Sequence, residues 1–296
     1  MHLSNTIKLH FTVFIWGFTA ILGALISLDA LPLVWYRVLF AGISLAVFLR
    51  FRGKLALLPS RKLLRLLGIG LLVSGHWICF YHSIKVSAVA VTLVCLSAQT
   101  LFTGLLEPAF NKRRLSLLDV FTGIMIIAGI ALIFHFETRY TEGIIVGLLA
   151  ALLACLFTIF NSWEIKKHDP VTISFYEMTG GWLGMTGFIV LSGGFNSLER
   201  FAFSNADLFY LILLSTVCTA FAYVWGVAVM RELSAYTVIL ITNMEPVYGI
   251  LLAVIFFGES ERMTTGFYLG ALIIIAAVFL HPVAKKHLLA IPAKRT

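Results

Sequence analysis

Glu245 and Pro246 stand near the middle of an apolar run that extends from residue 233 to residue 259. If this run crosses a bilayer, the carboxyl group lies near mid-depth, where a charge costs several kcal/mol unless it is paired, hydrated or protonated. Proline frees a helix carbonyl about one turn earlier, so we predict a kink with polar backbone beside the acid. Thr242 and Tyr248 lie about one turn to either side, on the same face as Glu245. These groups could form part of a solute path; the alternative is a protonated acid tied to a neighbouring helix beside a packing kink.

Other residues that could bind a polar solute fall inside other apolar runs. His76 and Tyr223 each lie near the middle of a run, and both can form hydrogen bonds. An intramembrane histidine seldom faces lipid, so we expect His76 to face an internal cavity. Gln99 can donate and accept hydrogen bonds, and Thr158 and Asn161 add further polar groups. A threonine such as Thr158 can equally bond its own helix carbonyl.

Arg37 and Glu177 carry opposite charges inside apolar runs, and they invite pairing. Counting along their helices places each about 9 Å deep, but from opposite faces of the membrane. In a core about 30 Å thick they would be separated by roughly 12 Å of depth. We therefore expect two separate rim groups, with Arg37 attracting carboxylates to the outer vestibule or holding a structural contact.

The elements that must position these residues are long and apolar. The chain is 60% hydrophobic and 12% charged, and its mean hydropathy of +0.98 lies outside the range of soluble domains. The runs are continuously apolar, without the alternation of β-barrel strands. We predict an all-α integral membrane protein in which residues 1–296 form a single membrane domain. Ten runs come close to the roughly 20 residues that a transmembrane helix needs: 7–28, 31–51, 63–84, 86–109, 117–135, 144–165, 171–194, 206–230, 234–257 and 265–281.

Lysine and arginine are distributed unequally among the segments that join these runs. If the N-terminus lies inside, the outer segments carry only Lys85, Arg139, Arg200 and Arg262. Most other basic residues then fall on the inner side, as the positive-inside rule requires. We therefore expect both termini in the cytoplasm and an even number of spans. The net charge of +8 arises from these short clusters and does not indicate a nucleic-acid partner.

Patterns typical of metal sites and catalytic centres are missing from the sequence. The four cysteines fall inside apolar runs without metal-ligand spacing, so they are most simply small packing residues. No GxSxG motif, Asp-rich motif or His-Asp constellation occurs. We expect no cofactor, no metal ion and no catalytic residue, which leaves an intramembrane enzyme as a distant alternative.

The two halves of the chain are weakly related to each other. Each half contains five of the predicted spans, and because five is odd, the halves would have opposite orientations. Such inverted repeats are a transporter architecture, with sites near the midplane at the repeat interface. We predict a first five-helix repeat at 1–136 and a second at 143–284, around a central cavity. An offset of 147 residues sets Ser87-Ala88 on Ser234-Ala235, Val91 on Val238, Leu105 on Leu252 and Gly123 on Gly270.

The sequence also resembles a known family. The second half is similar to the EamA-type repeat of the drug/metabolite transporter superfamily through Thr219, Ala222-Tyr223, Trp225, Glu245-Pro246-Val247, Phe257-Gly258-Glu259 and Leu269-Gly270. The first half agrees through Trp16-Gly17, Pro32, Arg37 and Ser87-Ala88. The resemblance covers nearly the whole chain. It implies ten helices around a central cavity, peripheral fifth and tenth helices, transport without ATP, and a cavity-facing Trp16. One departure is that Gln99 stands in the first repeat where Pro246 stands in the second, so a matched pair of midplane prolines is missing.

These expectations combine into one functional hypothesis. We expect a secondary transporter of the bacterial inner membrane that moves a small organic solute by alternating access, most simply exporting aromatic or neutral amino acids or related metabolites. A cavity of aromatic faces with a few polar groups suits such an amphipathic zwitterion. The alternative is a carrier for organic or quaternary ammonium cations, because an acid beside aromatic faces also suits these ions. The expected substrate-binding residues are Trp16, His76, Gln99, Thr158, Tyr223, Thr242, Glu245 and Tyr248, with Pro246 and Arg37 as gate or kink residues.

The expected partners are the small-molecule solute and membrane lipid. A homodimer through the peripheral helices is left open by the sequence.

Overall fold

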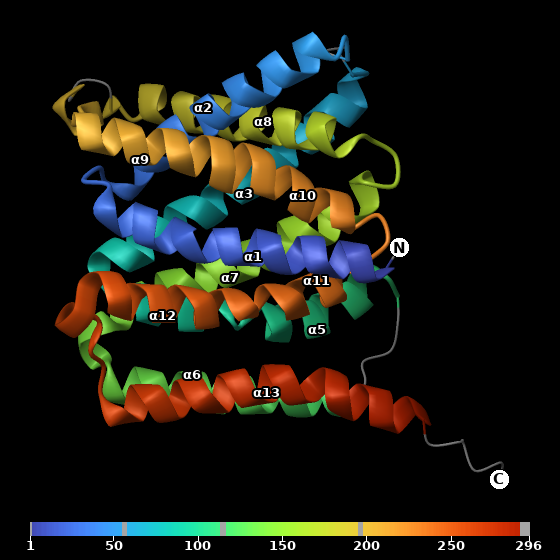
Figure 1. The fold of residues 1–296 in the computed structure, drawn as a ribbon, viewed down its shortest axis with the longest axis vertical. Coiled ribbons are helices and arrows are strands. Elements are labelled where there is room, and N and C mark those ends of the chain that lie inside the picture. Colours follow the sequence, from blue (N-terminus) through green and yellow to red (C-terminus); the bar gives the residue numbers. More distant parts are fainter. Residues whose placement is uncertain (1, 55–57, 113–116, 195–197, 291–296) are drawn as a thin grey trace.

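The computed structural model describes residues 2–54, 58–112, 117–194 and 198–290. These residues form helices joined by short turns, and no strand occurs among them. Figure 1 shows the long helices running side by side across the molecule. The all-α prediction is confirmed. The principal helices are α1 (His2–Leu25), α2 (Ala30–Phe51), α3 (Ser60–Val86), α4 (Val89–Leu96), α5 (Gln99–Phe110), α6 (Leu117–Phe136), α7 (Thr141–Glu164), α8 (Pro170–Leu191), α9 (Asn205–Ser215), α10 (Ala222–Val229), α11 (Ala235–Thr242), α12 (Met244–Phe257) and α13 (Thr265–Ala290), with a π-helical segment, η4 (Thr216–Phe221), between α9 and α10.

Within these described ranges, eight helical segments are long and apolar enough to cross a membrane. The eight segments are Asn5–Leu25, Ala30–Phe51, Ser60–Val86, Val89–Phe110, Leu117–Phe136, Thr138–Glu164, Asn205–Val229 and Ala235–Glu261. The apolar part of α13, Thr265–His281, is shorter, and α8 is not among the eight. The chain is therefore an integral membrane protein with eight candidate spans, and the other two predicted runs correspond to α8 and α13.

The turns that connect the helices lie at two opposite ends of the bundle. The end that holds the N-terminus also holds the connections after α2, α5, α7 and α10, on the right in Figure 1. We call this end the basic end, because Arg52, Lys54, Lys112, Lys167 and Arg231 lie in these connections. The connections after α1, α3, α6 and α12 lie at the other end, which we call the opposite end.

Two spans are interrupted near their middles. One consists of α4 and α5, which are separated at residues 97–98, and the other consists of α11 and α12, which are separated at Asn243. Pro246 lies in the first turn of α12, where its missing N–H costs no helix hydrogen bond. The helix breaks three residues before the proline, because the ring clashes with the carbonyl group four residues earlier, that of Thr242. The span that contains Gln99 is interrupted as well, although it lacks a proline at the equivalent position.

Asn243 connects the two interruptions. Its side-chain amide donates to the Ile239 carbonyl oxygen at 3.0 Å and also to the Thr100 hydroxyl group. This contact joins the break in the α11–α12 span to the first turn of α5. The two irregular segments are therefore held side by side.

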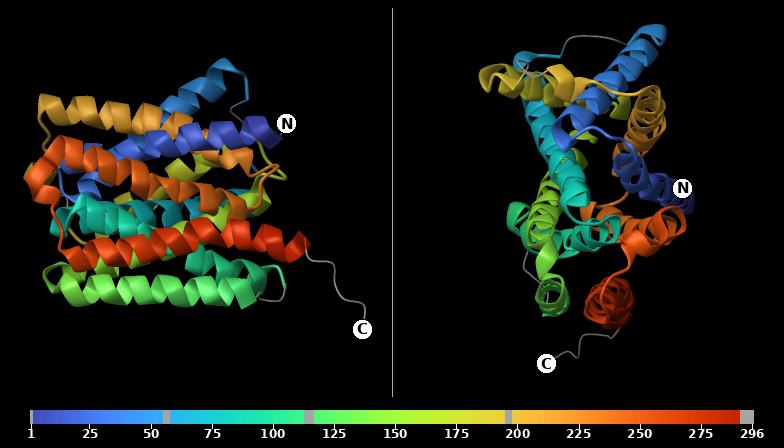
Figure 2. Two further views of the ribbon diagram at one scale, coloured as in Figure 1. Left: turned by 60° about the horizontal axis from the view of Figure 1, so that its bottom comes forward. Right: turned by 90° about the vertical axis from the view of Figure 1, so that its left-hand side faces the viewer.

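Helices α6 and α13 form a pair at one edge of the molecule, drawn green and red in Figures 1 and 2. Their axes approach closely at Gly129 and Gly270, where a Cβ atom on either residue would collide with the backbone carbonyl of the other. The outward faces of the pair carry exposed apolar side chains such as Phe121, Ile124 and Leu272. In a membrane protein such faces contact lipid, whereas a homodimer through this pair stays a prediction.

Candidate solute-binding cavity

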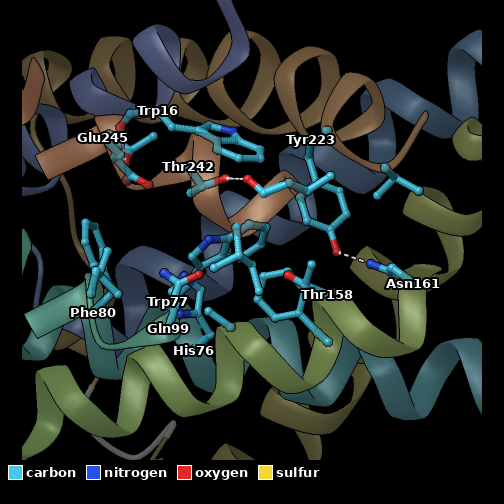
Figure 3. Close-up of a pocket in the computed structure, with 18 of the residues that line it drawn as sticks. Trp16, His76, Trp77, Phe80, Gln99, Thr158, Asn161, Tyr223, Thr242 and Glu245 are labelled. Atoms are coloured by element: carbon cyan, nitrogen blue, oxygen red, sulfur yellow. Dashed lines mark hydrogen bonds between the residues drawn. The ribbon is translucent and has the colours of Figure 1, made fainter. Parts of the chain in front are cut away.

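A narrow cavity lies among α1, α3, α4, α5, α7, α10, α11 and α12, with Arg37 reaching it from α2, and about 70 Å³ of it is accessible to the centre of a water-sized sphere. Figure 3 shows side chains from both halves of the chain pointing into it. Seven of the eight residues that the sequence predicted to bind a solute line this cavity: Trp16, His76, Gln99, Thr158, Tyr223, Thr242 and Glu245. Residues from spans far apart in the sequence therefore meet in one place.

Aromatic rings form much of the cavity wall. Trp77 and Tyr223 lie edge to face with ring centroids 5.8 Å apart, and Phe157 lies 6.3 Å from Tyr223. The indole of Trp16 covers Gly226 of α10, where a Cβ atom would collide with it. Gly226 therefore allows Trp16 to lie flat against α10. The wall offers flat apolar faces to a solute, as ligand pockets commonly do.

Arg37 lines the cavity and is buried. Its side chain is 2% exposed; Nε donates to the Thr219 hydroxyl at 2.8 Å and Nη1 donates to the Tyr81 hydroxyl at 2.6 Å. The guanidinium carbon lies 3.8 Å from the centre of the Trp77 ring. The expected structural contact is therefore present, because the long side chain carries the guanidinium group towards partners on α3 and η4. The depth of Arg37 in a membrane stays a prediction.

The π-helical segment η4 presents one of these partners. The Thr219 hydroxyl donates to the Leu214 carbonyl oxygen, five residues earlier, at 2.8 Å while it accepts from Arg37. The wider turn of a π-helix leaves such a carbonyl in need of a donor, and π-helical turns are frequent at functional sites. Sequence reasoning missed this role, because Thr219 was noted only through the family resemblance.

Glu245 is the acidic group of the cavity. It is 7% exposed and lies in the first turn of α12, where the helix dipole favours a negative charge. Among the described residues, no hydrogen bond or ion pair joins its carboxyl group to a side chain. The nearby charge that acts on it is that of Arg37. The cavity thus contains one basic and one acidic side chain that no ion pair joins among the described residues.

His76 and Thr242 present acceptor groups to the cavity. His76 Nδ1 lies 2.9 Å from the Ala150 carbonyl oxygen, which can only accept, so Nδ1 must carry the proton. In the neutral ring, Nε2 is then an acceptor available to a solute. Thr242 donates its hydroxyl proton to the Val238 carbonyl oxygen at 2.9 Å, which leaves the oxygen lone pairs free to accept. Thr158 is 5% exposed, and within the described residues its hydroxyl makes no bond to its own helix.

A buried polar layer lies behind Tyr223. The Tyr223 hydroxyl donates to Glu177 Oε2 at 2.7 Å and accepts from Asn161 Nδ2 at 3.0 Å. Glu177 is fully buried among neighbouring helices, and its depth in a membrane stays a prediction. Helix α8 packs deeply against α3, because Gly70 lets the Glu177 backbone approach. As expected, no ion pair joins Glu177 to Arg37 in the part of the chain that the structure describes.

Tyr248 and Pro246 do not line the cavity. The Tyr248 ring packs edge to face on Phe14 at 5.5 Å, and its Cβ atom lies against Gly17 of α1. Three residues turn a helix by about 300°, so Tyr248 faces about 60° to one side of Glu245, towards α1. The prediction that Tyr248 contacts a solute is corrected here. Pro246 is buried, and its effect is to end α11 ahead of Glu245.

A second hollow of about 270 Å³ lies at the basic end, between α5, α7 and the start of α11. Glu107, Asn111, Lys166 and Ser234 give it a polar lining. Met230 lines both this hollow and the central cavity, and it is 5% exposed. The Met230 side chain therefore separates the two spaces.

The opposite end is tied together by two carboxylates. Asp207 accepts from the Ser27 backbone N–H and hydroxyl, both at 2.7 Å. Glu261 accepts from the backbone N–H groups of Val89 at 3.1 Å and Ala90 at 2.9 Å, at the start of α4. Both contacts join the first half of the chain to the second. Their bonds hold helix ends together on this side of the cavity.

The model of the EamA-like transporter family matches the chain twice, over residues 7–135 and residues 141–281. The chain belongs to the EamA-like transporter family. The two matched segments together contain all the residues of the cavity described above. Membership supports a transporter role for this chain rather than an enzymatic one.

The curated relatives of this family member are named only as transporters. An uncharacterized transporter from Archaeoglobus fulgidus is 24% identical over 296 residues, covering 97% of this chain and 100% of the relative. The uncharacterized transporter YxxF from Bacillus subtilis is 24% identical over 259 residues, covering 85% of this chain and 81% of the relative.

A solved structure, described only as the crystal structure of a protein, has a TM-score of 0.68 with 15% sequence identity. The match covers 96% of this chain and 99% of that chain. A likeness at this identity shows a shared fold and carries no information about substrate.

Proposed function

We propose that this EamA-like transporter is a secondary carrier for a small zwitterionic solute, most simply a neutral or aromatic amino acid or a related metabolite. The observation that carries the proposal is the pair of charges in the cavity. Arg37 and Glu245 both line it, and they are not paired with each other among the described residues. A solute with a carboxylate and an ammonium group would satisfy both charges at once.

The contacts of Arg37 support an anionic group on the solute. Its partners among the described residues, the Thr219 and Tyr81 hydroxyls and the Trp77 ring, are all uncharged. A buried cation without a counter-charge is costly, and a carboxylate held by two N–H groups is the ligand that arginine accommodates best. In the proposed complex the solute carboxylate contacts the guanidinium group from the cavity side.

Glu245 and the aromatic wall support the rest of the solute. The carboxylate of Glu245 would receive the ammonium group, and the rings of Trp16, Trp77 and Tyr223 would contact the side chain. His76 Nε2 and Gln99 would hydrogen-bond polar atoms of the solute. Such a lining suits an amphipathic molecule with one apolar end.

We also propose ten membrane helices arranged as two inverted repeats that work by alternating access. Two matched family segments and two interrupted spans, joined by Asn243 and Thr100, support the repeats. The remaining two helices of the ten would be α8 and α13. Repeats of this kind place the site near the midplane and let one scaffold open to either side.

The two ends of the bundle support a direction for opening. At the basic end, the Met230 side chain separates the polar hollow from the cavity. At the opposite end, Asp207 and Glu261 hold helix ends from the two halves of the chain together. We infer that the protein is in a conformation in which the cavity is close to opening at the basic end. By the positive-inside rule we place that end, with both termini, in the cytoplasm of a bacterial inner membrane, and we propose export as the direction.

A carrier for organic cations is the second candidate, favoured by Glu245 beside aromatic faces. Arg37 in the same cavity opposes it, because a like charge repels a cation.

Counterflow into liposomes that contain the purified protein separates the two candidates. The labelled solutes are a neutral amino acid, the amine that lacks its carboxylate, the acid that lacks its ammonium group, and a quaternary amine. The proposal expects accelerated exchange of the amino acid and little exchange of either truncated analogue. Exchange of the amine and the quaternary amine, without exchange of the amino acid, would replace it by the cation carrier.

A further inference from the structure

A lateral groove opens between α3 and α7 at the basic end. Its volume is about 630 Å³, and it shares no residue with the lining of the central cavity. Its position, on the outer side of two membrane-spanning helices, makes lipid its natural neighbour. The groove is therefore a surface that the proposed transport path does not use.

The walls of this groove are apolar. Ile69 and Leu72 from α3 face Phe160 and Trp163 from α7. Gly68 lies between them, and a Cβ atom added there would meet nothing within 4 Å. The glycine therefore leaves open space in the groove that a larger side chain would fill. A hydrocarbon chain would gain contact with all these groups without burying a polar atom.

The mouth of the groove carries a surplus of positive charge. Arg65 Nη1 lies 3.0 Å from Glu164 Oε1, and Lys167 Nζ lies 3.8 Å from the same oxygen. Glu164 is 3% exposed, whereas the side chains of Arg65 and Lys167 are 62% and 55% exposed. One buried carboxylate thus orients two cations that both remain accessible. Arg61 and Lys62, about one turn from Arg65 on α3, are also exposed.

We propose that this groove binds an anionic phospholipid, with its phosphate at Arg65 and Lys167 and one acyl chain along Gly68, Ile69 and Phe160. The charge at the mouth favours an anion over a cation, and the apolar wall favours a ligand with a hydrocarbon chain. Basic pockets between helices at a membrane surface bind anionic head groups in this way. Trp163 is suited to the boundary between head group and chain.

Thermal unfolding of the delipidated full-length protein in detergent tests this site. A ligand that binds only the folded state raises the unfolding temperature. Phosphatidylglycerol should raise it more than phosphatidylcholine with the same acyl chains, and high salt should reduce the difference. An equal rise with both lipids would overturn the proposal.

Variants separate the two parts of the site. Removing both cations would leave the buried Glu164 carboxylate unpaired, so the charge variant is R65Q/E164Q/K167Q. It should lose most of the phosphatidylglycerol-specific shift, whereas R200Q/R262Q, which removes two exposed cations with exposed partners at the opposite end, should keep it. G68L fills the groove with the charges intact and should reduce the shifts from both lipids. A phosphatidylglycerol-specific shift that survives in R65Q/E164Q/K167Q and in G68L would refute the site.

This measurement requires no transport assay. If the lipid site is refuted, the proposed carrier function is unaffected. If the carrier function is refuted, the lipid site is likewise unaffected.

Discussion

Arg37 and Glu245 line one cavity from different halves of the chain, yet no ion pair joins them in the described residues. Neither side chain has a partner of opposite charge at bonding distance among the described residues. This relationship leads to the first prediction. R37Q should weaken the apparent affinity for an amino acid by roughly 10- to 100-fold, since a hydrogen bond to a charged group contributes about 1.5–3 kcal/mol.

E245Q should have a comparable effect on the same solute by removing the partner of the ammonium group. The two variants should differ with truncated analogues: R37Q should reduce discrimination against the amine, and E245Q should reduce discrimination against the acid. Counterflow with each analogue measures this. R200Q and E142Q, at exposed positions of the opposite end, serve as matched controls. Unchanged transport in E245Q would assign the acid to packing.

Tyr223 holds the fully buried Glu177 through its hydroxyl group. Y223F should lower the free energy of unfolding by about 1–3 kcal/mol, because a buried acceptor loses its donor. Y223F/E177Q should recover part of this loss, since an amide is less costly to bury than a carboxylate. Thermal unfolding in detergent measures both variants. If Y223F is as stable as wild type, the buried layer does not depend on this bond.

Met230 separates the cavity from the hollow at the basic end. M230A should connect the two spaces, and a cysteine placed at Thr158 should then react several-fold faster with an impermeant thiol reagent applied to the basic end. M230W should slow both labelling and transport by filling the partition. The same variants without the new cysteine control for reaction at the four native thiols. Equal labelling rates in M230A and wild type would place the route elsewhere.

Glu261 caps α4 by accepting two backbone N–H bonds across the halves of the chain. E261Q removes the negative charge at this helix N-terminus, so the opposite end should open more often. A cysteine at the cavity residue Thr19 should consequently be labelled faster from that side, and E259Q, at an exposed acid nearby, should leave the rate unchanged. Labelling that does not respond to E261Q would mean that this cap does not control opening.

Much of the architecture is predictable from the sequence, because a bilayer requires the segments that cross it to be long and apolar and to satisfy their own backbone hydrogen bonds. Long apolar runs without charge must become helices in lipid, whatever their neighbours are. The same constraint marks His76, Gln99 and Glu245 as internal, since polar groups in lipid are costly, and all three line the cavity. Pro246 indicates an interruption, and one lies three residues before it.

The contacts that the sequence did not determine are those where neighbouring helices decide the outcome. The contacts of Arg37 depend on where Thr219 and Tyr81 lie, and the burial of Glu177 depends on the close packing of α8 at Gly70. The direction of Tyr248 depends on α1, which offers Phe14. Helical spacing determines which residues share a face of one helix. Only tertiary packing decides what that face meets, because it fixes the rotation and tilt of each helix against its neighbours.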